Sequence, residues 1–425
     1  MPLLLLYRLA AFALAPLAQP LLLWRARSGK EDPARLGERR GCAGMARPEG
    51  RLVWLHGASV GEGLSLLPLI DLLVRQGVEV LVTSGTSAAA LVLRDRLPAG
   101  ATHQFAPLDA PQFVARFLDH WRPEIALFAE SEIWPNMLGG LAKREIPLVL
   151  VNARISETSS ERWRKAPSVA VKLFGQIALC LAQDAENAER FRNLGVRRVE
   201  VVGNLKFDAP APPVDPLKLA TLQGALATRP VFAAVSTHAG EEALALDAHV
   251  AMARALPELL TVIAPRHPER GAEIVKLAAE RRLRTLRRSE ESAPPANDTE
   301  IYVADTLGEL GLVFRTAGVV FMGRSFHPGG GHNPIEPARF GCAILHGPNV
   351  GDFAEIYAAL DDAKGAHRVE DAAGIARAAQ ALLSQPSRVR KMGRAATEVV
   401  GRLSGAAAQT MTALAPYLAR ESETP

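Results

Sequence analysis

The chain has 425 residues, enough for two or three domains of ordinary size. With 48% hydrophobic, 22% charged and 5% aromatic residues, its composition excludes a disordered chain, a collagen-like protein and a disulfide-rich miniprotein. The net charge of +4 is too small to indicate a nucleic-acid partner.

Residues 1–28 are predicted to form a membrane anchor. The first 24 residues carry one charge, Arg8, and three basic residues follow within 25–30. A secretory signal peptide has its charge before the apolar run, whereas charge after the run favours an anchor that keeps the rest of the chain in the cytoplasm. The uncharged run is short for a bilayer core of about 30 Å, and Pro16 and Pro20 are expected to kink it. A spanning helix, an interfacial helix and an apolar helix packed on a domain remain open.

The positive charge of the chain is concentrated beside this anchor. The first 51 residues hold nine basic and four acidic side chains, a net charge of +5, which leaves −1 for the other 374 residues. Such a flank suits an anionic membrane surface. The cysteines, Cys42, Cys180 and Cys342, are far apart and form no C-x-x-C pair, which indicates reduced thiols and no zinc finger.

Beyond residue 51, short apolar runs alternate with amphipathic stretches, which predicts a parallel sheet with helices on both faces. The strands predicted in the first half are 52–56, 78–83, 124–129, 147–152, 177–182 and 199–202. The helices predicted there are 62–76, 87–96, 112–121, 135–144 and 185–194.

A proline-rich segment, DAPAPPVDP at 208–216, predicts a linker, after which the alternation restarts. The strands predicted in the second half are 230–235, 259–264, 301–303, 318–322 and 342–345. The helices predicted there are 241–255, 269–280, 307–315, one from residue 333 and others at the end of the chain. We therefore predict two doubly wound α/β domains, at 29–207 and 217–425, with ligands bound in the crevice between them.

The first candidate site is the turn HGASVGEG at 56–63, between a strand and a helix. Glycines permit a close backbone approach, and the start of a helix attracts anions. The spacing is not G-x-G-x-x-G, and no acidic residue ends the second strand, so a dinucleotide site and a dehydrogenase are disfavoured. Glu62 lies at the start of the helix, where it is either a catalytic base or a carboxylate that complements the helix dipole.

Two further candidates follow later strands of the first half. ESEIWPN at 130–136 puts Glu130 and Glu132 after a buried strand, and strand alternation predicts that only one of them faces the crevice. A carboxylate that caps the next helix is the alternative. Lys206, in GNLKFD before the linker, is either a cation that reaches a ligand or a solvated surface lysine.

The second half carries two candidate anion sites. PRHPER at 265–270 places Arg266 and His267 after a strand, either for an anionic ligand or for a local salt-bridge cluster. GRSFHPGGGHNPIEP at 323–337 is the strongest candidate. Its three glycines form a backbone cradle for anions before a helix predicted to have Asn333 as N-cap and Pro334 at its first position. Histidines 327 and 332 lack partners at metal-ligand spacing, so no metal site is expected.

Together these segments resemble the 3-deoxy-D-manno-octulosonic acid (Kdo) transferases of lipopolysaccharide assembly. The resemblance covers nearly the whole chain, in family order: the N-terminal anchor, LHGASVGE, ESEIWPN, PLVLVNARIS, GNLKFD, STHAGEE, PRHPER, DTLGEL and GGHNPIEPA. It implies a GT-B fold, with two Rossmann-like domains facing a central cleft, on the cytoplasmic side of the inner membrane. The implied donor is CMP-Kdo, and the implied acceptor is lipid IVA, an acylated diglucosamine bisphosphate.

The resemblance also implies roles for individual residues. Glu62 is the general base of an inverting displacement that needs no metal, cofactor or covalent intermediate. Glu130 and Lys206 stabilise the transition state. The residues that match CMP-binding positions are Arg266, His267, Leu307, Gly308, Glu309, Asn333, Pro334, Ile335 and Glu336. The sequence departs from the family at Gly57, where Ser is frequent, and at Arg324, where Gly is frequent.

Two alternatives remain open. The first is another GT-B enzyme with a uridine nucleotide donor, and the second is an anchored binding protein without catalysis. The segment SSERWRKAP at 159–167 presents Arg162, Arg164 and Lys165 either to lipid phosphates or to solvent. The number of Kdo residues transferred is left open by the sequence.

Overall fold

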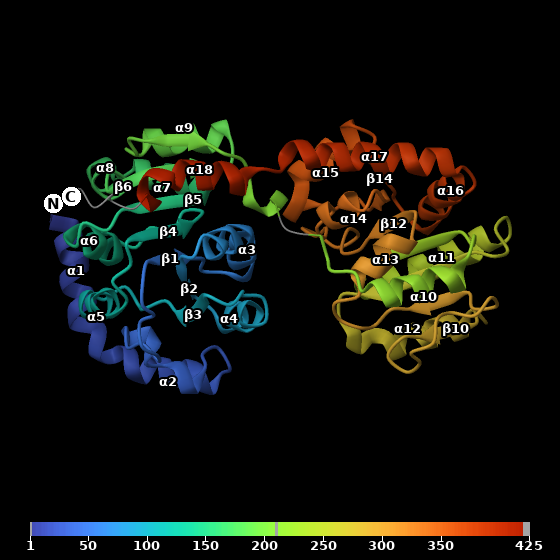
Figure 1. The fold of residues 1–425 in the computed structure, drawn as a ribbon, viewed down its shortest axis with the longest axis horizontal. Coiled ribbons are helices and arrows are strands. Elements are labelled where there is room, and N and C mark those ends of the chain that lie inside the picture. Colours follow the sequence, from blue (N-terminus) through green and yellow to red (C-terminus); the bar gives the residue numbers. More distant parts are fainter. Residues whose placement is uncertain (1, 209–210, 420–425) are drawn as a thin grey trace. The chain divides into compact units, whose positions relative to one another are not determined.

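The computed structural model describes residues 2–208 and 211–419 and divides the chain into two compact units (Figure 1). The first unit comprises Met1–Ala209 and Leu403–Pro425, and the second comprises Pro210–Arg402. Met1 of the predicted anchor, residues 209–210 of the predicted linker and residues 420–425 of the predicted C-terminal domain lie outside the described residues.

The sheet of the first unit is entirely parallel, in the strand order β3-β2-β1-β4-β5-β6-β7. Its strands are β1 (Leu52–His56), β2 (Glu79–Ser84), β3 (Ala101–Phe105), β4 (Ile125–Ala129), β5 (Leu148–Ala153), β6 (Ile177–Ala182) and β7 (Val199–Val201). The order reverses between β1 and β4, and the carboxyl ends of strands at such a point are where doubly wound sheets bind ligands.

Helices cover both faces of this sheet because the side chains of each strand alternate between two hydrophobic clusters. In β1, Val53 and Leu55 face one cluster, and Leu52 and Trp54 face the other. The helices are α3 (Val60–Arg75), α4 (Ser87–Arg94), α5 (Pro111–Trp121), α6 (Pro135–Lys143), α7 (Glu157–Arg164), α8 (Pro167–Phe174), α9 (Ala185–Asn193) and α18 (Ala406–Leu418). α3 and α18 pack on the first face, and α5, α6 and α8 pack on the second.

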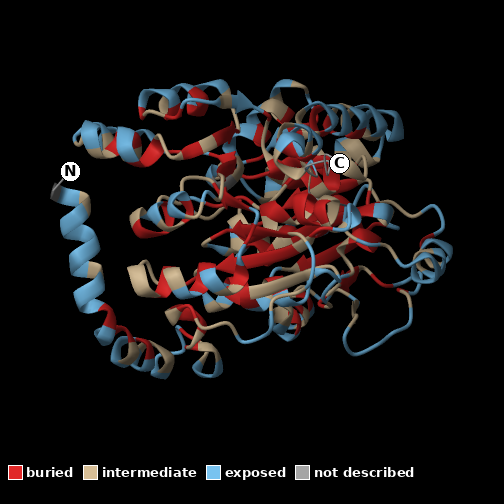
Figure 2. Ribbon diagram, turned by 60° about the vertical axis from the view of Figure 1, so that its left-hand side comes forward, coloured by how far each residue is buried: buried red, intermediate tan, exposed pale blue. Residues whose placement is uncertain are grey.

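The N-terminal segment forms two helices, α1 (Pro2–Leu14) and α2 (Ala18–Arg27), joined by a 3₁₀ turn that contains Pro16. The predicted kink is thus present at this proline. Figure 2 shows α1 largely exposed along its length. Residues Leu3–Arg27 form one apolar stretch long enough to cross a membrane, and little of it is buried. The Tyr7 hydroxyl donates to Asp109 at 2.9 Å, which ties α1 to the first unit.

The second unit repeats the architecture, with the parallel strand order β10-β11-β9-β8-β12-β13-β14. Its strands are β8 (Val231–Thr237), β9 (Leu260–Pro265), β10 (Thr285–Arg287), β11 (Ile301–Val303), β12 (Val319–Met322), β13 (Ala343–His346) and β14 (Ala366–Arg368). Its helices are α10 (Pro216–Leu226), α11 (Glu241–Ala253), α12 (Gly271–Glu280), α13 (Leu310–Thr316), α14 (Ile335–Arg339), α15 (Ala354–Asp362), α16 (Ala372–Leu383) and α17 (Pro386–Leu403). The order here reverses between β8 and β12.

The end of the chain returns to the first unit, although the sequence analysis assigns 217–425 to the C-terminal domain. Ala406, Ala407 and Leu414 of α18 are buried in the same cluster as α3. The Asp208 carboxylate accepts the N–H groups of Gly405 and Ala407, both at 2.6 Å, and so caps this helix. This packing, which is driven by apolar burial, places residues 403–419 with the first unit.

The structure confirms the predicted α/β class and most of the predicted strands. β1, β6 and β11 have the predicted bounds. The edge strands β3, β10 and β14 are not predicted, because short edge segments carry little apolar periodicity. The helices α7, α8 and α10 are not predicted either.

Candidate functional site

Glu62 lies in the first turn of α3, directly after β1. Ser59 is the N-cap of this helix, and its hydroxyl donates to Glu62 Oε1 at 2.7 Å. The Ala58 N–H donates to Glu62 Oε2 at 2.8 Å. The carboxylate is therefore held by two donors at the carboxyl end of β1, beside the point of reversal in the sheet.

Glu130 and Glu132 follow β4, the strand on the other side of that point. The Glu132 carboxylate accepts the indole N–H of Trp134 at 2.7 Å and lies 3.8 Å from His56 Nε2. Glu130 Oε1 lies 3.5 Å from Lys206 Nζ. The expectation that only one of the two glutamates faces the crevice rests on strand alternation, which does not continue through Glu130. Glu130 has φ 54°, and this left-handed residue ends the alternation.

The electrostatics of these carboxylates are coupled. Burial raises the pKa of Glu62, the hydrogen bonds from Ser59 and Ala58 oppose it, and the negative charges of Glu132 and Glu130 raise it further. For Glu132, burial also raises the pKa, but His56 and the Trp134 N–H outweigh it and leave the pKa below its usual range. Glu62 is therefore the carboxylate whose proton affinity is raised toward that of a general base.

Lys206 reaches this site from the 3₁₀ turn Leu205–Asp208, which Asn152 and Asn204 hold in place. The Leu205 N–H donates to Asn152 Oδ1 at 2.9 Å, and the Lys206 N–H donates to Asn204 Oδ1 at 3.0 Å. Asn152 is fully buried and has φ 50°. Such backbone strain persists where the surroundings fix it, frequently at functional sites.

In the second unit, Arg266 and His267 follow β9, and both side chains are exposed. The salt-bridge alternative applies in part, because His267 Nδ1 lies 3.7 Å from Glu269, and a second cluster forms around Arg270. Arg270 Nε lies 2.9 Å from Glu242, which is completely buried, and Arg270 Nη1 lies 3.0 Å from Glu273. Arg266 and His267 are therefore exposed, whereas Arg270 is held by buried Glu242.

The turn at Leu307, Gly308 and Glu309 follows β11. Leu307 is 82% exposed, and Gly308 has φ 80°, which favours glycine. Glu309 is occupied by its own unit, since Lys218 Nζ lies 2.6 Å from Oε1 and Arg288 Nε donates to Oε2 at 3.1 Å. The hydrogen bond from Arg288 is foremost among the contacts that lower the pKa of Glu309 to about 2, followed by those from Lys218 and Thr306. Its side chain thus fixes the turn.

The glycine-rich loop after β12 leads into α14, which begins at Ile335. The predicted cap is displaced by one residue, because Pro334 is the residue before the helix and Asn333 Oδ1 accepts the Ile335 N–H at 3.0 Å. A Cβ on Gly330 would meet the Arg324 carbonyl oxygen at 1.9 Å, so the loop requires this glycine. Since α14 has only five residues, its dipole contributes little, and the loop and nearby basic groups are the features suited to an anion.

Gly57 and Arg324, the two positions where the sequence departs from the family, differ in what a side chain meets there. A Cβ at Gly57 would meet the Gly63 nitrogen at 3.0 Å, so a side chain there requires a small shift of the turn. Arg324 has φ 59°, a backbone conformation that a glycine adopts without strain.

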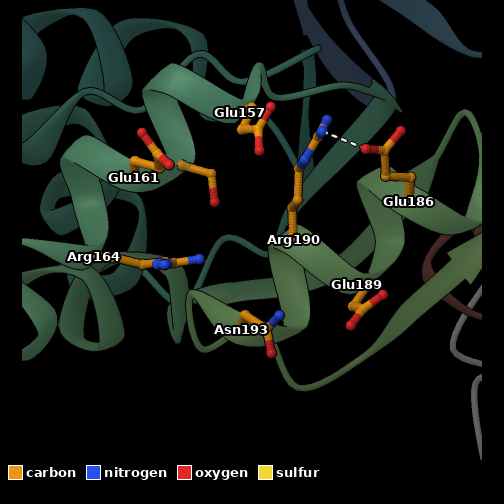
Figure 3. Close-up of a pocket in the computed structure, with 8 residues that line it drawn as sticks. Glu157, Glu161, Arg164, Glu186, Glu189, Arg190 and Asn193 are labelled. Carbon is orange, nitrogen blue, oxygen red and sulfur yellow. Dashed lines mark hydrogen bonds and ion pairs between the residues drawn. The ribbon is translucent and has the colours of Figure 1, made fainter.

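A separate pocket of about 220 Å³ lies between α7 and α9 (Figure 3). It is lined by Glu157, Ser160, Glu161, Arg164, Glu186, Glu189, Arg190 and Asn193. Arg190 is paired with Glu186 in this pocket. Because four carboxylates outnumber two guanidinium groups, the surroundings of Arg164 do not suit a lipid phosphate. Among the described residues, no group of three or more His, Cys, Asp or Glu side chains could hold a metal ion.

Sequence reasoning missed several residues that the structure brings to these sites. His56, Asn152 and Glu241 are buried polar residues at strand or helix ends. Each lies in a segment that resembles the family, His56 in LHGASVGE, Asn152 in PLVLVNARIS and Glu241 in STHAGEE. A polar residue at the end of an apolar strand is the signal that could have identified His56 and Asn152, whereas Glu241 begins α11.

Comparisons with known proteins agree on one family. A family model described as 3-deoxy-D-manno-octulosonic-acid transferase (kdotransferase) matches residues 34–209. The chain is 34% identical over 413 residues to the probable 3-deoxy-D-manno-octulosonic acid transferase, mitochondrial, of Arabidopsis thaliana, covering 94% of this chain and 92% of that protein. It is 32% identical over 397 residues to the 3-deoxy-D-manno-octulosonic acid transferase of Haemophilus influenzae, covering 91% and 92%.

Among solved structures, a glycosyltransferase from Rickettsia africae matches with a TM-score of 0.56 and 13% identity. The match covers 88% of this chain and 100% of that chain. At this identity the likeness concerns the fold.

Proposed function

Because the chain belongs to the Kdo transferase family, we propose that it moves Kdo from CMP-Kdo to lipid IVA with Glu62 as the general base. Kdo transfer from CMP-Kdo in lipopolysaccharide biosynthesis follows from the family, and two parallel-sheet α/β units are the GT-B architecture. The acceptor, the roles of individual residues and the membrane association make up the proposal.

The observation that carries the proposed base is the position and environment of Glu62. Attack by a sugar hydroxyl requires a group that takes its proton, and a carboxylate within hydrogen-bond reach serves this purpose. Glu62 lies at the carboxyl end of β1, and burial raises its pKa. Its neighbours Glu130 and Glu132 support the same direction, because a second negative charge makes a carboxylate a stronger base.

Lys206 and Glu130 would act on the charge that develops during transfer. The anomeric carbon of Kdo gains oxocarbenium character as the bond to CMP breaks, and CMP leaves as an anion. A carboxylate stabilises the first charge and an ammonium group the second. The 3.5 Å contact between Glu130 Oε1 and Lys206 Nζ supports a paired role.

The second unit would bind the donor, and the first unit the acceptor. Arg266 and His267 are exposed basic groups after β9, suited to the CMP phosphate. Glu309 would act by fixing the turn at Leu307 and Gly308, since its carboxylate is already occupied. Asn333, Pro334, Ile335 and Glu336 would contribute the start of α14, with Glu336 accepting hydrogen bonds from ribose hydroxyls.

We place the protein at the inner membrane with both units on the cytoplasmic side. The exposed apolar side chains of α1 and α2 support membrane association. The flanking positive charge supports it less strongly than the sequence suggests, because Arg25 and Arg39 pair with Glu31 and Arg35 pairs with Glu38. No metal or cofactor is required for this single displacement.

The test is to incubate the purified full chain with lipid IVA and a CMP-Kdo-generating system, and to analyse the lipid by mass spectrometry. We expect a mass increase of one or more Kdo units, and an initial rate of product formation lower by about 10²-fold or more with Glu62→Gln. Absence of product with the wild-type chain would contradict the lipid IVA assignment. In a parallel thermal-shift measurement, CMP should raise the melting temperature more than UDP does, since only a ligand of the native state stabilises it.

A further inference from the structure

Four histidines gather in the second unit at the carboxyl ends of β8, β9 and β12. The rings of His238 and His332 are stacked, with 5.2 Å between centroids, and their Nε2 atoms are 3.0 Å apart. The His238 ring also lies 5.5 Å from His267 and 5.9 Å from His327. β8 and β12 flank the reversal of strand order, so the pair occupies in this sheet the position that Glu62 and Glu130 occupy in the other.

Buried side chains hold this pair in place. Glu241 is 1% exposed, and its carboxylate accepts the His238 N–H at 3.0 Å and the Phe326 N–H at 3.1 Å. Tyr357 is completely buried, and its hydroxyl donates to the His332 carbonyl oxygen at 2.8 Å. The two rings thus come from separate loops that are tied to one framework.

The charged side chains that influence the pair are basic. Burial is the largest cause of the lowered pKa of His238. The positive charges of its basic neighbours lower it further: His267, His327, Arg324 and Arg266. Burial, followed by His238, Arg266, Arg324 and His267, lowers the pKa of His332 to about 4. Two nearby carboxylates are engaged elsewhere, Glu241 by backbone N–H groups and Glu242 by Arg270. A third, Glu269, lies 3.7 Å from His267 and not in contact with the pair.

We propose that the His238–His332 pair is the subsite for the carboxylate of the donor sugar, an inference that rests on the proposed function. Kdo is an ulosonic acid, so its anomeric carbon bears both the carboxylate and the oxygen of the CMP phosphate. A site for this donor must therefore accept two anions side by side. Arg266 and His267 provide for the phosphate, and the histidine pair provides for the second anion.

The chemistry of the pair specifies how the carboxylate binds. An Nε2–Nε2 contact of 3.0 Å holds one hydrogen, since two N–H groups cannot point at each other. A carboxylate has two oxygens and accepts two donors. Both rings can turn an Nε2–H to the carboxylate if the second ring moves its hydrogen from Nδ1 to Nε2, or if that ring takes up a proton from solvent. Proton uptake is the favoured route, because a protonated imidazole makes a charge-assisted hydrogen bond to a carboxylate. Binding of the donor is thus coupled to the uptake of up to one proton.

Isothermal titration calorimetry on the full chain without acceptor tests this inference. CMP and CMP-Kdo are titrated in phosphate and in Tris at pH 7.5, because the difference in buffer ionisation heat reports proton uptake. We expect uptake with CMP-Kdo and little with CMP. His238→Gln should weaken CMP-Kdo binding about tenfold or more, change CMP binding by less than about twofold and abolish the uptake.

The matched control is His367→Gln, which removes an exposed histidine of the same unit from β14. Equal proton uptake for CMP and CMP-Kdo in the wild-type chain would overturn the inference without any variant. A His238→Gln variant that weakens the binding of both ligands equally would also overturn it, because the pair would then belong to the phosphate. If His238→Gln does not fold, His332→Gln replaces it with the same expectations. Absence of CMP binding by the wild-type chain would instead contradict the proposed function.

Discussion

Ser59 and Glu62 form a reciprocal pair, in which the Ser59 hydroxyl donates to Glu62 Oε1 at 2.7 Å and the Glu62 N–H donates to Ser59 Oγ at 3.3 Å. This arrangement is a variant of the capping box that begins many helices. The same carboxylate therefore starts α3 and is our proposed base. The choice of substitution can distinguish the structural role of Glu62 from its proposed catalytic role.

Glu62→Gln should remove catalysis and retain the fold. The amide cannot take a proton, and general bases contribute about 10²–10⁴-fold to a rate. Its oxygen still accepts from Ser59 or Ala58, so we expect the free energy of unfolding to fall by no more than about 1 kcal/mol. The measurements are the turnover number and CMP affinity. A variant with turnover near that of the wild-type chain would exclude Glu62 as the base.

Ser59→Ala should change the pH dependence. The Ser59 hydroxyl lowers the pKa of Glu62, so its removal raises that pKa further. A base acts when it is deprotonated, and activity is lost as the pH falls through its pKa. We therefore expect the acidic limb of the kcat profile to move to higher pH in Ser59→Ala, and to lower pH in Glu132→Gln. Profiles that coincide with that of the wild-type chain would show that another group limits the rate.

Lys206→Met should lower kcat by about 10²-fold, as expected when one charged stabiliser of a transition state is removed. Its pair with Glu130 spans 3.5 Å, and both side chains are partly exposed, so the effect on stability should be small. Lys206→Arg, which retains the charge, is the control and should lose less activity. Equal activities of Lys206→Met and the wild-type chain would disprove the role.

The exposed leucines of α1 should mediate membrane binding. Leu6 and Leu9 are 63% and 57% exposed, and replacing both with Asp places two charges on the apolar surface. We expect the double variant to bind less to vesicles that contain anionic lipid in a flotation assay. Leu217→Asp is the matched control, because Leu217 is 81% exposed in the second unit. If the double variant and the control float equally, the anchor assignment fails.

His249 should make the protein less stable in acid. Burial lowers its pKa to about 4 in the folded chain, whereas the unfolded value is near 6.5. Between these values the unfolded chain binds more protons, so stability falls as the pH drops from 6.5 toward 4. Urea unfolding at pH 7.5 and pH 5 gives the drop in the free energy of unfolding between these two pH values. We expect this drop to be larger in the wild-type chain than in His249→Gln, by up to about 2 kcal/mol. The exposed His367→Gln should lose as much as the wild-type chain.

The sequence predicts the central strands well because each is a continuous apolar run between turn signals. β1 and β6, buried on both faces, have the predicted bounds. The edge strands β3 and β10 are partly exposed and lack that signal. The fold class therefore followed from periodicity alone, while strand order, which places Glu62 beside Glu130, depends on contacts between segments far apart in the chain.

The candidate site was predicted in part. Motif resemblance pointed to Glu62, Glu130 and Lys206, and the structure places them in one unit with Glu130 and Lys206 in contact. The motif resemblance did not predict the hydrogen bond between Arg288 and Glu309, because this pairing links residues 21 positions apart. The left-handed backbone at Glu130 and Asn152 is also absent from any local pattern, since neither position is a glycine.

The return of α18 to the first unit means that the second unit is an insertion within the first along the chain. A gene fragment that encodes residues 210–402 is one uninterrupted stretch, whereas the first unit needs two. Expressed alone, residues 1–209 would leave Val202 and Leu205 without the cover of α18 and Asp208 without the helix that it caps. Such a fragment should aggregate, and a separately supplied peptide of residues 403–425 should restore its solubility.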